Sequence, residues 1–416
     1  MHKFSSSQDA ARQSMLQSSQ PVYQQDCTPT SLEWISKLVS FDTTSRESNL
    51  GLIEMVRDYL RREGIESSLT YDPFDRKANL FATIPGASGA TQGGVVLSGH
   101  TDVVPVDGQM WDSDPFKAEV RGDKLYGRGT CDMKAFIGTA LALIPEMRRA
   151  SLQQPMHLAL SYDEEVGCLG APVMLQELKS RGIRLDGCIV GEPTSMRVVV
   201  AHKSQNSYRC CVRGHAAHSS LTPSGANAIE YAARLICFIR DLADELRANG
   251  PFDDAFDVPF STGQTGTIHG GIALNTVPDR CEFSFEYRTL PGIDPQRIFE
   301  RIKAYAHGTL LPKMHAEHPD TAIELAQIAA VPSLDSSEQE AIAKLVRALT
   351  LDRERRKVAY TTEAGHFQLA GIPTVLCGPG DVLQAHKPNE FVALSQIAQC
   401  EAFLRKVIRS LEESSI

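Results

Sequence analysis

The stretch Val95–Asp107, VVLSGHTDVVPVD, decides the fold that this sequence predicts. Residues 95–97 form a short apolar run typical of a buried strand, and Pro105 prevents that strand from continuing. His100 and Asp102 therefore lie where the strand gives way to a loop, which is where open α/β sheets bind their ligands. Such a pair is often only a hydrogen-bonded loop contact, so the remaining histidines and carboxylates must decide its meaning.

Acidic or histidine residues follow several other predicted strands in the same way. Each lies after a short apolar segment or in the glycine-rich turn YGRGTCDMK, residues 126–134. In chain order the candidates are His100, Asp132, Glu165, Glu192 and His386, with Asp102 and Glu164 beside two of them. Residues 163–165 considered alone are a solvated acidic turn, but buried carboxylates at several strand ends are costly unless they are paired or bind metal.

Two imidazoles and three carboxylates form a ligand set for two divalent cations. Such a mixed nitrogen and oxygen set suits zinc, cobalt or manganese, and a carboxylate between the two ions can bridge them. Asp132 is the better bridging group, so its neighbour Cys131 is the weaker ligand candidate.

The order of predicted elements indicates an α/β protein in which a mainly parallel sheet is flanked by helices. Strands and helices alternate from about residue 30 to residue 200, and the pattern then changes to strand, helix, two strands, helix, strand. That second order is typical of a ferredoxin-like α+β module inserted into the first domain. We therefore expect a flexible extension over 1–29, a catalytic metal-binding domain over 30–206 and 327–416, and a lid or dimerisation domain over 207–326.

Composition excludes several classes of protein. The net charge of −9 argues against a nucleic-acid partner, which would need a basic surface. The apolar runs are strand-sized, far below the roughly 20 residues of a membrane span. The first 26 residues are rich in Ser and Gln and lack the apolar core of a secretory signal, and the ten cysteines are scattered. These features favour a cytoplasmic protein with free thiols.

Five motifs together carry a family resemblance. GHTDVVP, GRGTCDMK, SYDEEVGCLGA, GEPT and AHKPNEF, in this order and spacing, resemble the dinuclear zinc amidohydrolases and peptidases of the M20 family. The resemblance extends from about Thr30 to the C-terminus. It implies a zinc-peptidase-like catalytic domain, metal-dependent amide hydrolysis and two bound divalent ions, with zinc the first expectation and cobalt or manganese the alternatives.

The resemblance also implies a role for each candidate. Asp132 would bridge the two ions, with His100 and Glu192 completing one set of ligands and Glu165 and His386 the other. Asp102 would orient the imidazole of His100 through its far nitrogen. Glu164 would act as general base and then general acid. A cis peptide bond is expected between Asp132 and Met133.

Three further residues are assigned to the substrate by the same resemblance, and a fourth, Glu363, is a hypothesis that rests on its place after a predicted strand. His218, in GHAAHSSLTPSGANAI, matches a histidine that reaches across a homodimer to stabilise the oxyanion in the partner's site, although His215 lies close by. Asn275 and Arg288 would bind the substrate's α-carboxylate, for which a guanidinium is geometrically suited. Glu363 would lie near a cationic substrate side chain, or would act as an acid at the start of a helix.

Within the family, the motifs are most similar to the branch that deacetylates acetylornithine. This implies removal of the acetyl group from N2-acetyl-L-ornithine, a small-molecule N-acyl amino acid. The alternatives are the same chemistry on another N-acyl amino acid, on succinyl-diaminopimelate or on a peptide, and a non-catalytic relative that uses the fold for binding. The intact set of residues, Glu164 included, argues against the last.

Overall fold

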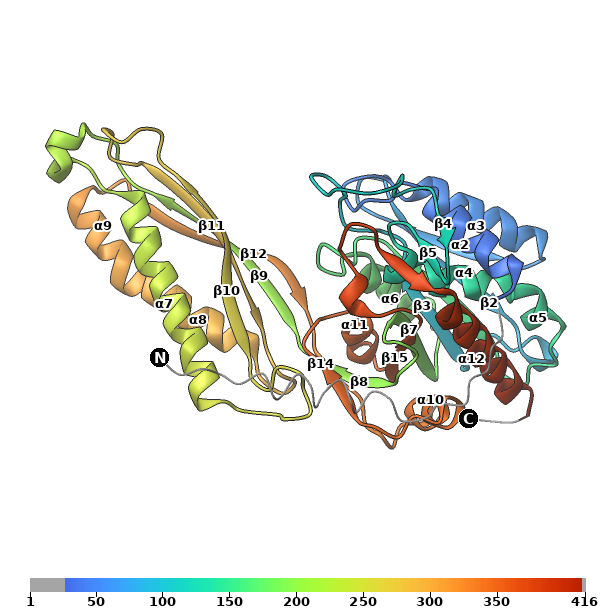
Figure 1. Ribbon diagram of the computed structural model, residues 1–416. Coiled ribbons are helices and arrows are strands. Elements are labelled where there is room, and N and C mark those ends of the chain that lie inside the picture. Colours follow the sequence, from blue (N-terminus) through green and yellow to red (C-terminus); the bar gives the residue numbers. More distant parts are fainter. Residues whose placement is uncertain (1–26, 414–416) are drawn as a thin grey trace, which may run out of the picture.

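Two sheets organise the chain in the computed structural model, which describes residues 27–413 (Figure 1). In this range a nine-stranded sheet forms the core of a large body and a four-stranded sheet forms the core of a smaller one. Most of the predicted extension, residues 1–26, lies outside the described residues. The described start of the chain is already anchored, because the main-chain N–H of Thr28 donates to Glu401 Oε1 at 2.8 Å and its side chain caps helix α2 (Pro29–Val39).

The nine-stranded sheet has a parallel centre and antiparallel edges. Its order is β1–β2–β6–β3–β7–β15–β8–β13, with β14 also paired to β8. Neighbours within the group β6, β3, β7 and β15 are parallel, whereas β1, β2 and β13 pair in antiparallel fashion. The strands are β1 (Ser67–Tyr71), β2 (Ala78–Ile84), β3 (Val95–His100), β6 (Met156–Ser161), β7 (Gly187–Pro193), β8 (Val199–His202), β13 (Leu334–Asp335), β14 (Arg356–Val358) and β15 (Thr374–Gly378). The predicted fold class is confirmed.

Helices bury both faces of this sheet. Successive side chains of a strand point to opposite faces, so Val95 and Leu97 of β3 enter one hydrophobic core and Val96 enters the other. The first core is closed by α3 (Leu50–Arg62), α4 (Ala135–Ala142), α5 (Ile144–Arg149), α10 (Ala341–Thr350) and α12 (Leu394–Glu413). The second is closed by α6 (Gly170–Ser180) and α11 (Ala364–Leu369). The sheet's strand ends are therefore held by packing from both sides.

One predicted helix is divided in the structure. The sequence predicts a single helix over residues 133–149, but the chain forms the tight turn η3 (Thr130–Lys134), then α4, and then α5. Pro145 lies in the first turn of α5, where its missing N–H has no helical partner to lose. The break after α4 is thus a consequence of this proline.

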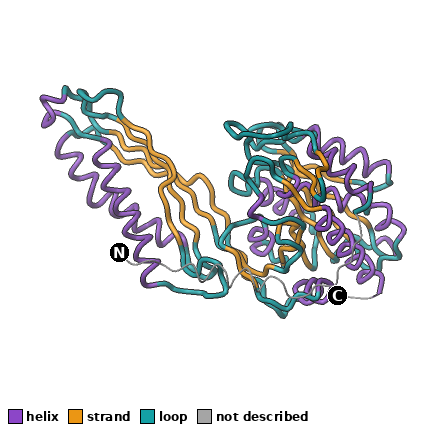
Figure 2. The backbone as a smooth tube through the Cα atoms, viewed as in Figure 1, coloured by secondary structure: helices purple, strands orange, loops and turns teal. Residues whose placement is uncertain are grey.

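The smaller body, which we call the lid, consists of residues 205–331. It contains β9 (Gln205–Arg213), η4 (Ser219–Ser224), α7 (Ala228–Asn249), β10 (Thr262–Gly270), β11 (Arg280–Arg288), α8 (Pro295–Tyr305), α9 (Leu311–Glu317) and β12 (Ala322–Val331). The strand order is β10–β11–β9–β12 with every pair antiparallel, which is a ferredoxin-like arrangement. The helices lie along one face of the lid sheet (Figure 2).

The lid joins the large body through two neighbouring chain segments. Gln205 pairs with Val331 at the end of the lid sheet, and His202 pairs with Leu334 in the large sheet. The two crossings therefore form a short two-stranded ribbon between the bodies.

Candidate metal centre

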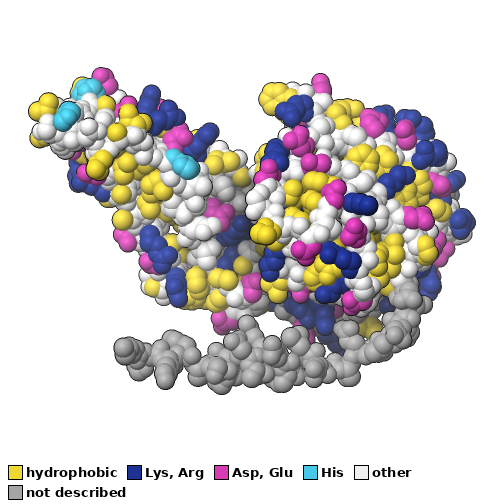
Figure 3. Space-filling model, turned by 45° about the horizontal axis from the view of Figure 1, so that its top comes forward, with side chains coloured by type: hydrophobic (Ala, Val, Ile, Leu, Met, Phe, Trp, Pro, Cys, Tyr) yellow, Lys and Arg dark blue, Asp and Glu magenta, His cyan; other side chains and the backbone are white. Residues whose placement is uncertain are grey.

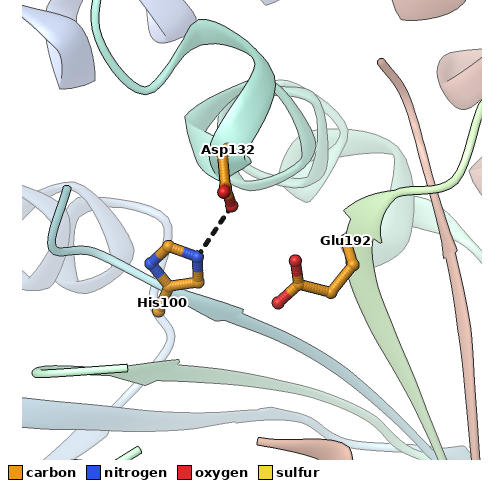
Figure 4. A group of neighbouring side chains, drawn as sticks. All are labelled: His100, Asp132 and Glu192. Atoms are coloured by element: carbon orange, nitrogen blue, oxygen red, sulfur yellow. Dashed lines mark hydrogen bonds and ion pairs between the residues drawn. The ribbon is translucent and has the colours of Figure 1, made fainter. Parts of the chain in front are cut away.

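Three buried side chains from different segments meet at the carboxyl ends of the central strands. His100 is the last residue of β3 and Glu192 lies near the end of β7, which runs parallel beside it. Asp132 comes from η3 above them. The ligand atoms of the three lie within 4.8 Å of one another, and the side chains point toward a common centre (Figure 4).

Asp132 links this first group to a second. Its Oδ1 lies 3.0 Å from His100 Nε2, and its Oδ2 lies 3.3 Å from His386 Nε2. His386 Nε2 is in turn 3.0 Å from Glu165 Oε2. The peptide bond between Asp132 and Met133 is cis, as the family resemblance predicted. One carboxylate thus faces both imidazoles with separate oxygens.

The electrostatics of the centre favour added positive charge. Burial and neighbouring carboxylates raise the pKa of Glu164 to about 8 and that of Glu165 to about 7, and they raise the pKa of Glu192 well above its ordinary value. Among the described residues, Oε1 of Glu192 is buried without a hydrogen-bond partner. An orphaned carboxylate oxygen among crowded acids and two imidazoles fits two divalent cations, so the donor set agrees with the predicted site.

Asp102 supports the centre in more ways than predicted. His100 Nδ1 lies 2.9 Å from the main-chain oxygen of Asp102 and 3.6 Å from its carboxylate. The carboxylate instead accepts the main-chain N–H groups of Glu164 and Glu165, at 3.0 and 3.2 Å, and the hydroxyl of Ser45 at 2.7 Å. Asp102 therefore orients His100 mainly through its main chain and holds the acidic turn through its side chain.

Glu164 lies beside the candidate ligand Glu165 and is half-buried. Its Oε1 accepts a hydrogen bond from the Cys168 thiol at 3.4 Å. The turn that carries it is anchored on the other side by an ion pair between Lys77 and Asp163. The general-base candidate is thus held at the edge of the metal centre.

Glu363 lies at the start of a helix, where one of its two predicted roles places it. It is fully buried at the start of α11, and its two carboxylate oxygens accept hydrogen bonds from Ser98 of β3 and Ser161 of β6, at 2.7 and 2.5 Å. A carboxylate enclosed in this way has no face left for a substrate ammonium group. Glu363 directly precedes α11, so its position agrees with the second alternative, an acid at the start of a helix, although its side chain makes no capping hydrogen bond.

The three other predicted substrate residues lie on the lid and are not gathered at one place. His218 is exposed at the start of η4, and its main chain pairs with Thr276 next to Asn275 at the free end of the lid. Arg288 lies at the other end of β11, where it contacts Glu286 and Thr361 near the large body. One chain therefore does not bring Asn275 and Arg288 together.

Sequence reasoning missed a buried ion pair beneath Asp132. Arg128 Nη1 donates to Glu390 Oε2 at 2.7 Å, and both side chains are 1% exposed. Glu390 lies in the motif AHKPNEF, but only the histidine of that motif was considered. Residues 386–388 of that motif are exposed, so no local pattern marked Glu390 as a buried charge.

The family model described as Peptidase family M20/M25/M40 matches residues 96–410. The chain belongs to this family. An M20/M25/M40 chain is a metal-dependent amidohydrolase, which agrees with the donor set and with Glu164 beside it.

Relatives of this M20/M25/M40 chain match along nearly their whole length. It is 32% identical over 391 residues to a protein of Proteus mirabilis named acetylornithine deacetylase, covering 92% of this chain and 97% of that one. It is 34% identical over 390 residues to a protein of the same name from Myxococcus xanthus, covering 92% and 98%.

A solved structure shares the fold. The M20 family metallo-carboxypeptidase of Sulfolobus solfataricus aligns with a TM-score of 0.72 at 17% identity, covering 92% of this chain and 100% of that one. In the part of the chain from residue 27 to residue 413, no helix combines the length and apolar character needed to cross a membrane.

Proposed function

We propose that this chain removes the acetyl group from N2-acetyl-L-ornithine and releases ornithine and acetate. Two observations support the proposal. Relatives named acetylornithine deacetylase match about nine-tenths of the chain at 32% and 34% identity. The strand ends also gather two ligand groups that share Asp132, next to a further carboxylate, Glu164. The product would supply arginine biosynthesis, and we expect the enzyme to work in the cytoplasm.

The ligand residues would hold two divalent ions. His100 and Glu192 would share one ion with Asp132, and Glu165 and His386 would share the other, because these are the two groups whose donor atoms converge. When bound, such ions polarise an amide carbonyl and make a water molecule more acidic. Zinc is the first expectation for this mixture of imidazole and carboxylate donors.

Glu164 would move the proton during hydrolysis. It is not needed as a ligand in either group, and the Asp102 side chain fixes the main chain on which it sits. In the proposed reaction its carboxylate accepts the proton of the attacking water and then donates that proton to the leaving nitrogen. Burial and neighbouring carboxylates raise the pKa of Glu164 in the metal-free chain, and the two bound ions would lower it.

His218 would serve the site of a partner subunit. It is exposed at the start of η4, and the segment 214–227 lies at the end of the lid that Figure 1 draws farthest from the large body. Figure 3 shows histidine and hydrophobic side chains together at this end of the lid. Exposed Leu221, Ile272 and Leu274 belong to the same region. A homodimer in which the lid end of one chain reaches the metal centre of the other would use His218 to stabilise the oxyanion.

Substrate recognition is proposed for two places in that dimer. Asn275 would enter the partner's site together with His218, because both lie at the end of the lid. Arg288 would bind the α-carboxylate from the end of β11 that lies near the large body. A guanidinium pairs well with a carboxylate, and Arg288 is only partly engaged by Glu286 at 3.2 Å.

A panel of N-acyl amino acids tests the proposal. The metal-loaded protein should hydrolyse N2-acetylornithine with a kcat/KM among the highest of a set that also contains acetylmethionine, succinyl-diaminopimelate and a dipeptide. A higher kcat/KM on one of the other compounds would mean that this compound, and not N2-acetylornithine, is the substrate. The proposed amide hydrolysis would still stand.

A variant and a chelator test the mechanism. Glu164→Gln should lower kcat by at least about 100-fold, since general acid and base catalysis contributes about 100- to 10,000-fold. The variant should still bind two metal ions per chain, because Glu164 is not a proposed ligand. Removing metal from the unaltered protein should abolish activity, and zinc or cobalt should restore it. Retained activity in either experiment would contradict the mechanism.

A further inference from the structure

A buried hydrogen-bond network ties two distant segments to each other behind the second ligand group. Glu390 Oε1 accepts the main-chain N–H groups of Cys131 and Asp132, at 2.7 and 3.1 Å. Its Oε2 accepts the N–H of Gly129 at 3.0 Å and one guanidinium N–H of Arg128. One carboxylate therefore fixes the main chain of the turn that carries the shared ligand Asp132.

The same network reaches His386 from the other side. Arg128 Nη2 donates to Gln109 Oε1 at 2.5 Å, and Gln109 Nε2 donates to the main-chain oxygen of His386 at 2.9 Å. Arg128 Nη1 also lies 3.3 Å from the main-chain oxygen of Lys387. Gln109, Arg128 and Glu390, which we call the clamp, thus connect the main chains of both ligands, Asp132 and His386.

The two ligand groups depend differently on such support. His100 and Glu192 lie on paired strands in the middle of the large sheet, where the strand ladder holds them. His386 lies on a loop with a left-handed backbone, φ 65°, and its side chain is 55% exposed. The ends of this loop are also tied to the turn, by the Cys131 thiol to the Asp381 carbonyl at 3.3 Å and by the Gly127 N–H to the Glu390 carbonyl at 3.0 Å. Among the described contacts, Gln109 is the partner that reaches the main chain of His386 itself.

Stability alone does not account for a charged pair in this place. Burying Arg128 and Glu390 costs desolvation energy, and apolar residues of similar volume often stabilise a protein as well or better. The pair instead fixes the geometry of the groups around it, because a carboxylate and a planar guanidinium form hydrogen bonds only in certain directions.

We propose that the clamp positions Asp132 and His386 for the second metal ion, and that it sets the affinity of that ion. These are positioning residues, which act through the ligands. The inference rests on the two-metal site of the proposed function. Loosening the contact between Gln109 and His386 should weaken binding of the second ion more than binding of the first, because His386 belongs to the second group alone whereas Asp132 is shared.

Gln109 offers a mild test because it is only partly buried and carries no charge. Metal-free protein is titrated with zinc in the presence of a competing chelating indicator, which yields the number of ions and both dissociation constants. In Gln109→Ala the weaker constant should rise about 10- to 100-fold, as is usual when an outer partner of a ligand is lost. His386→Ala provides the reference for complete loss of the second site.

A second variant separates the two contacts of Gln109. Gln109→Glu keeps an acceptor for Arg128 and for Trp111, whose indole N–H lies 3.2 Å away, but it has no donor for the His386 carbonyl. Gln109→Glu should therefore weaken the binding of the second ion as much as Gln109→Ala does. If Gln109→Glu binds both ions like the unaltered protein, the contact with His386 does not position the ligand and the proposal is overturned.

Gln296→Ala is the matched control, because it removes a similar glutamine contact, 2.9 Å to Glu300, on the lid helix α8. It should leave both constants unchanged, and an equal loss in this control would also overturn the proposal. Thermal unfolding of each metal-free variant checks that the chain still folds. If the unaltered protein binds fewer than two ions, the two-metal function fails, whereas two ions with no change in Gln109→Ala contradicts the clamp alone.

Discussion

His157 is a neutral imidazole enclosed within the large sheet, away from the metal centre. Its Nε2 donates to the Gly93 carbonyl at 2.9 Å and its Nδ1 accepts from the Thr83 hydroxyl at 2.9 Å. Burial lowers the pKa of His157 to about 4, and the hydrogen bond to Gly93 only partly opposes this. Protonation is therefore disfavoured in the folded chain and is favoured by unfolding.

The stability of the metal-free chain should accordingly fall in mild acid. The pKa of His157 is about 6.5 when unfolded and about 4 when folded, so between these values the unfolded chain binds more protons. The stabilising contribution is complete above pH 6.5 and is lost as the pH falls toward 4. Between pH 7 and pH 5 the loss from this group should be about 2 kcal/mol.

Urea unfolding of the unaltered protein and of His157→Gln at pH 7 and pH 5 measures this contribution. His202 and His366, whose pKa values burial also lowers to about 4, remain in both proteins and cancel in the comparison. The unaltered protein should lose about 2 kcal/mol more than the variant over this range. Equal losses would contradict a neutral buried His157.

The positions of the candidate ligands followed from the sequence because each depends on a local pattern, a short apolar strand followed by a histidine or carboxylate. The environment of Glu363 did not follow from the sequence, because its partners Ser98 and Ser161 lie more than 200 residues away in the chain. The clamp was missed for the same reason. Arg128 and Glu390 are 262 residues apart and become a pair only through the fold.

At the scale of elements, β7 and α4 are packed so closely that no side chain larger than a hydrogen atom fits at Gly191. A Cβ atom placed on Gly191 would lie 1.9 Å from Cγ of Phe136, a buried side chain of α4. Gly191 also directly precedes the ligand Glu192. The glycine of the motif GEPT is therefore explained by helix packing and not by turn geometry.

Gly191→Ala should destabilise the chain by about 1–3 kcal/mol, the usual cost of overpacking a core. Phe136→Leu in the same protein should recover part of this loss, so the two changes should be less than additive. Urea unfolding of the two single variants and the double variant measures the coupling. Gly308→Ala is the control, because an added Cβ there meets nothing within 4 Å, and additive losses at Gly191 and Phe136 would contradict the packing argument.

The order of elements is predicted well from the sequence because turn signals and periodicity are local, and the order strand, helix, two strands, helix, strand already indicates the lid. The division of the helix over residues 133–149 was not, although Pro145 marks it, because the apolar pattern continues through the break. Periodicity therefore outweighed the proline in the prediction.

At the scale of the whole molecule, the placement of His218 makes the proposed dimer testable. One subunit carries Glu164→Gln and the other carries His218→Ala, and each is expected to be nearly inactive as a homodimer. In a mixed dimer, the site with intact Glu164 would receive the intact His218 of its partner. Mixed dimers, formed by co-expression and separated by two affinity tags, should regain about half of the activity of the unaltered dimer.

The opposite result is equally clear. If His218 serves its own chain, neither site in the mixed dimer is complete, and activity stays at the level of the two parent variants. Size-exclusion chromatography of the same samples checks that dimers are present. The family resemblance implied this arrangement for His218, whereas residue patterns do not give it, because the distance from the lid end to a metal centre depends on how the two bodies are joined.

The two-stranded ribbon between the bodies bears on how this protein is able to evolve. It is formed by the pairs Gln205 with Val331 and His202 with Leu334. Because the lid leaves and re-enters the large body at adjacent points, a gene segment encoding it would be gained, lost or exchanged without breaking the sheet that holds the ligands. A short peptide bridging residues 204 and 332 would close the gap. The metal centre and the lid, which carries the proposed substrate-binding residues, are thus able to change separately in evolution.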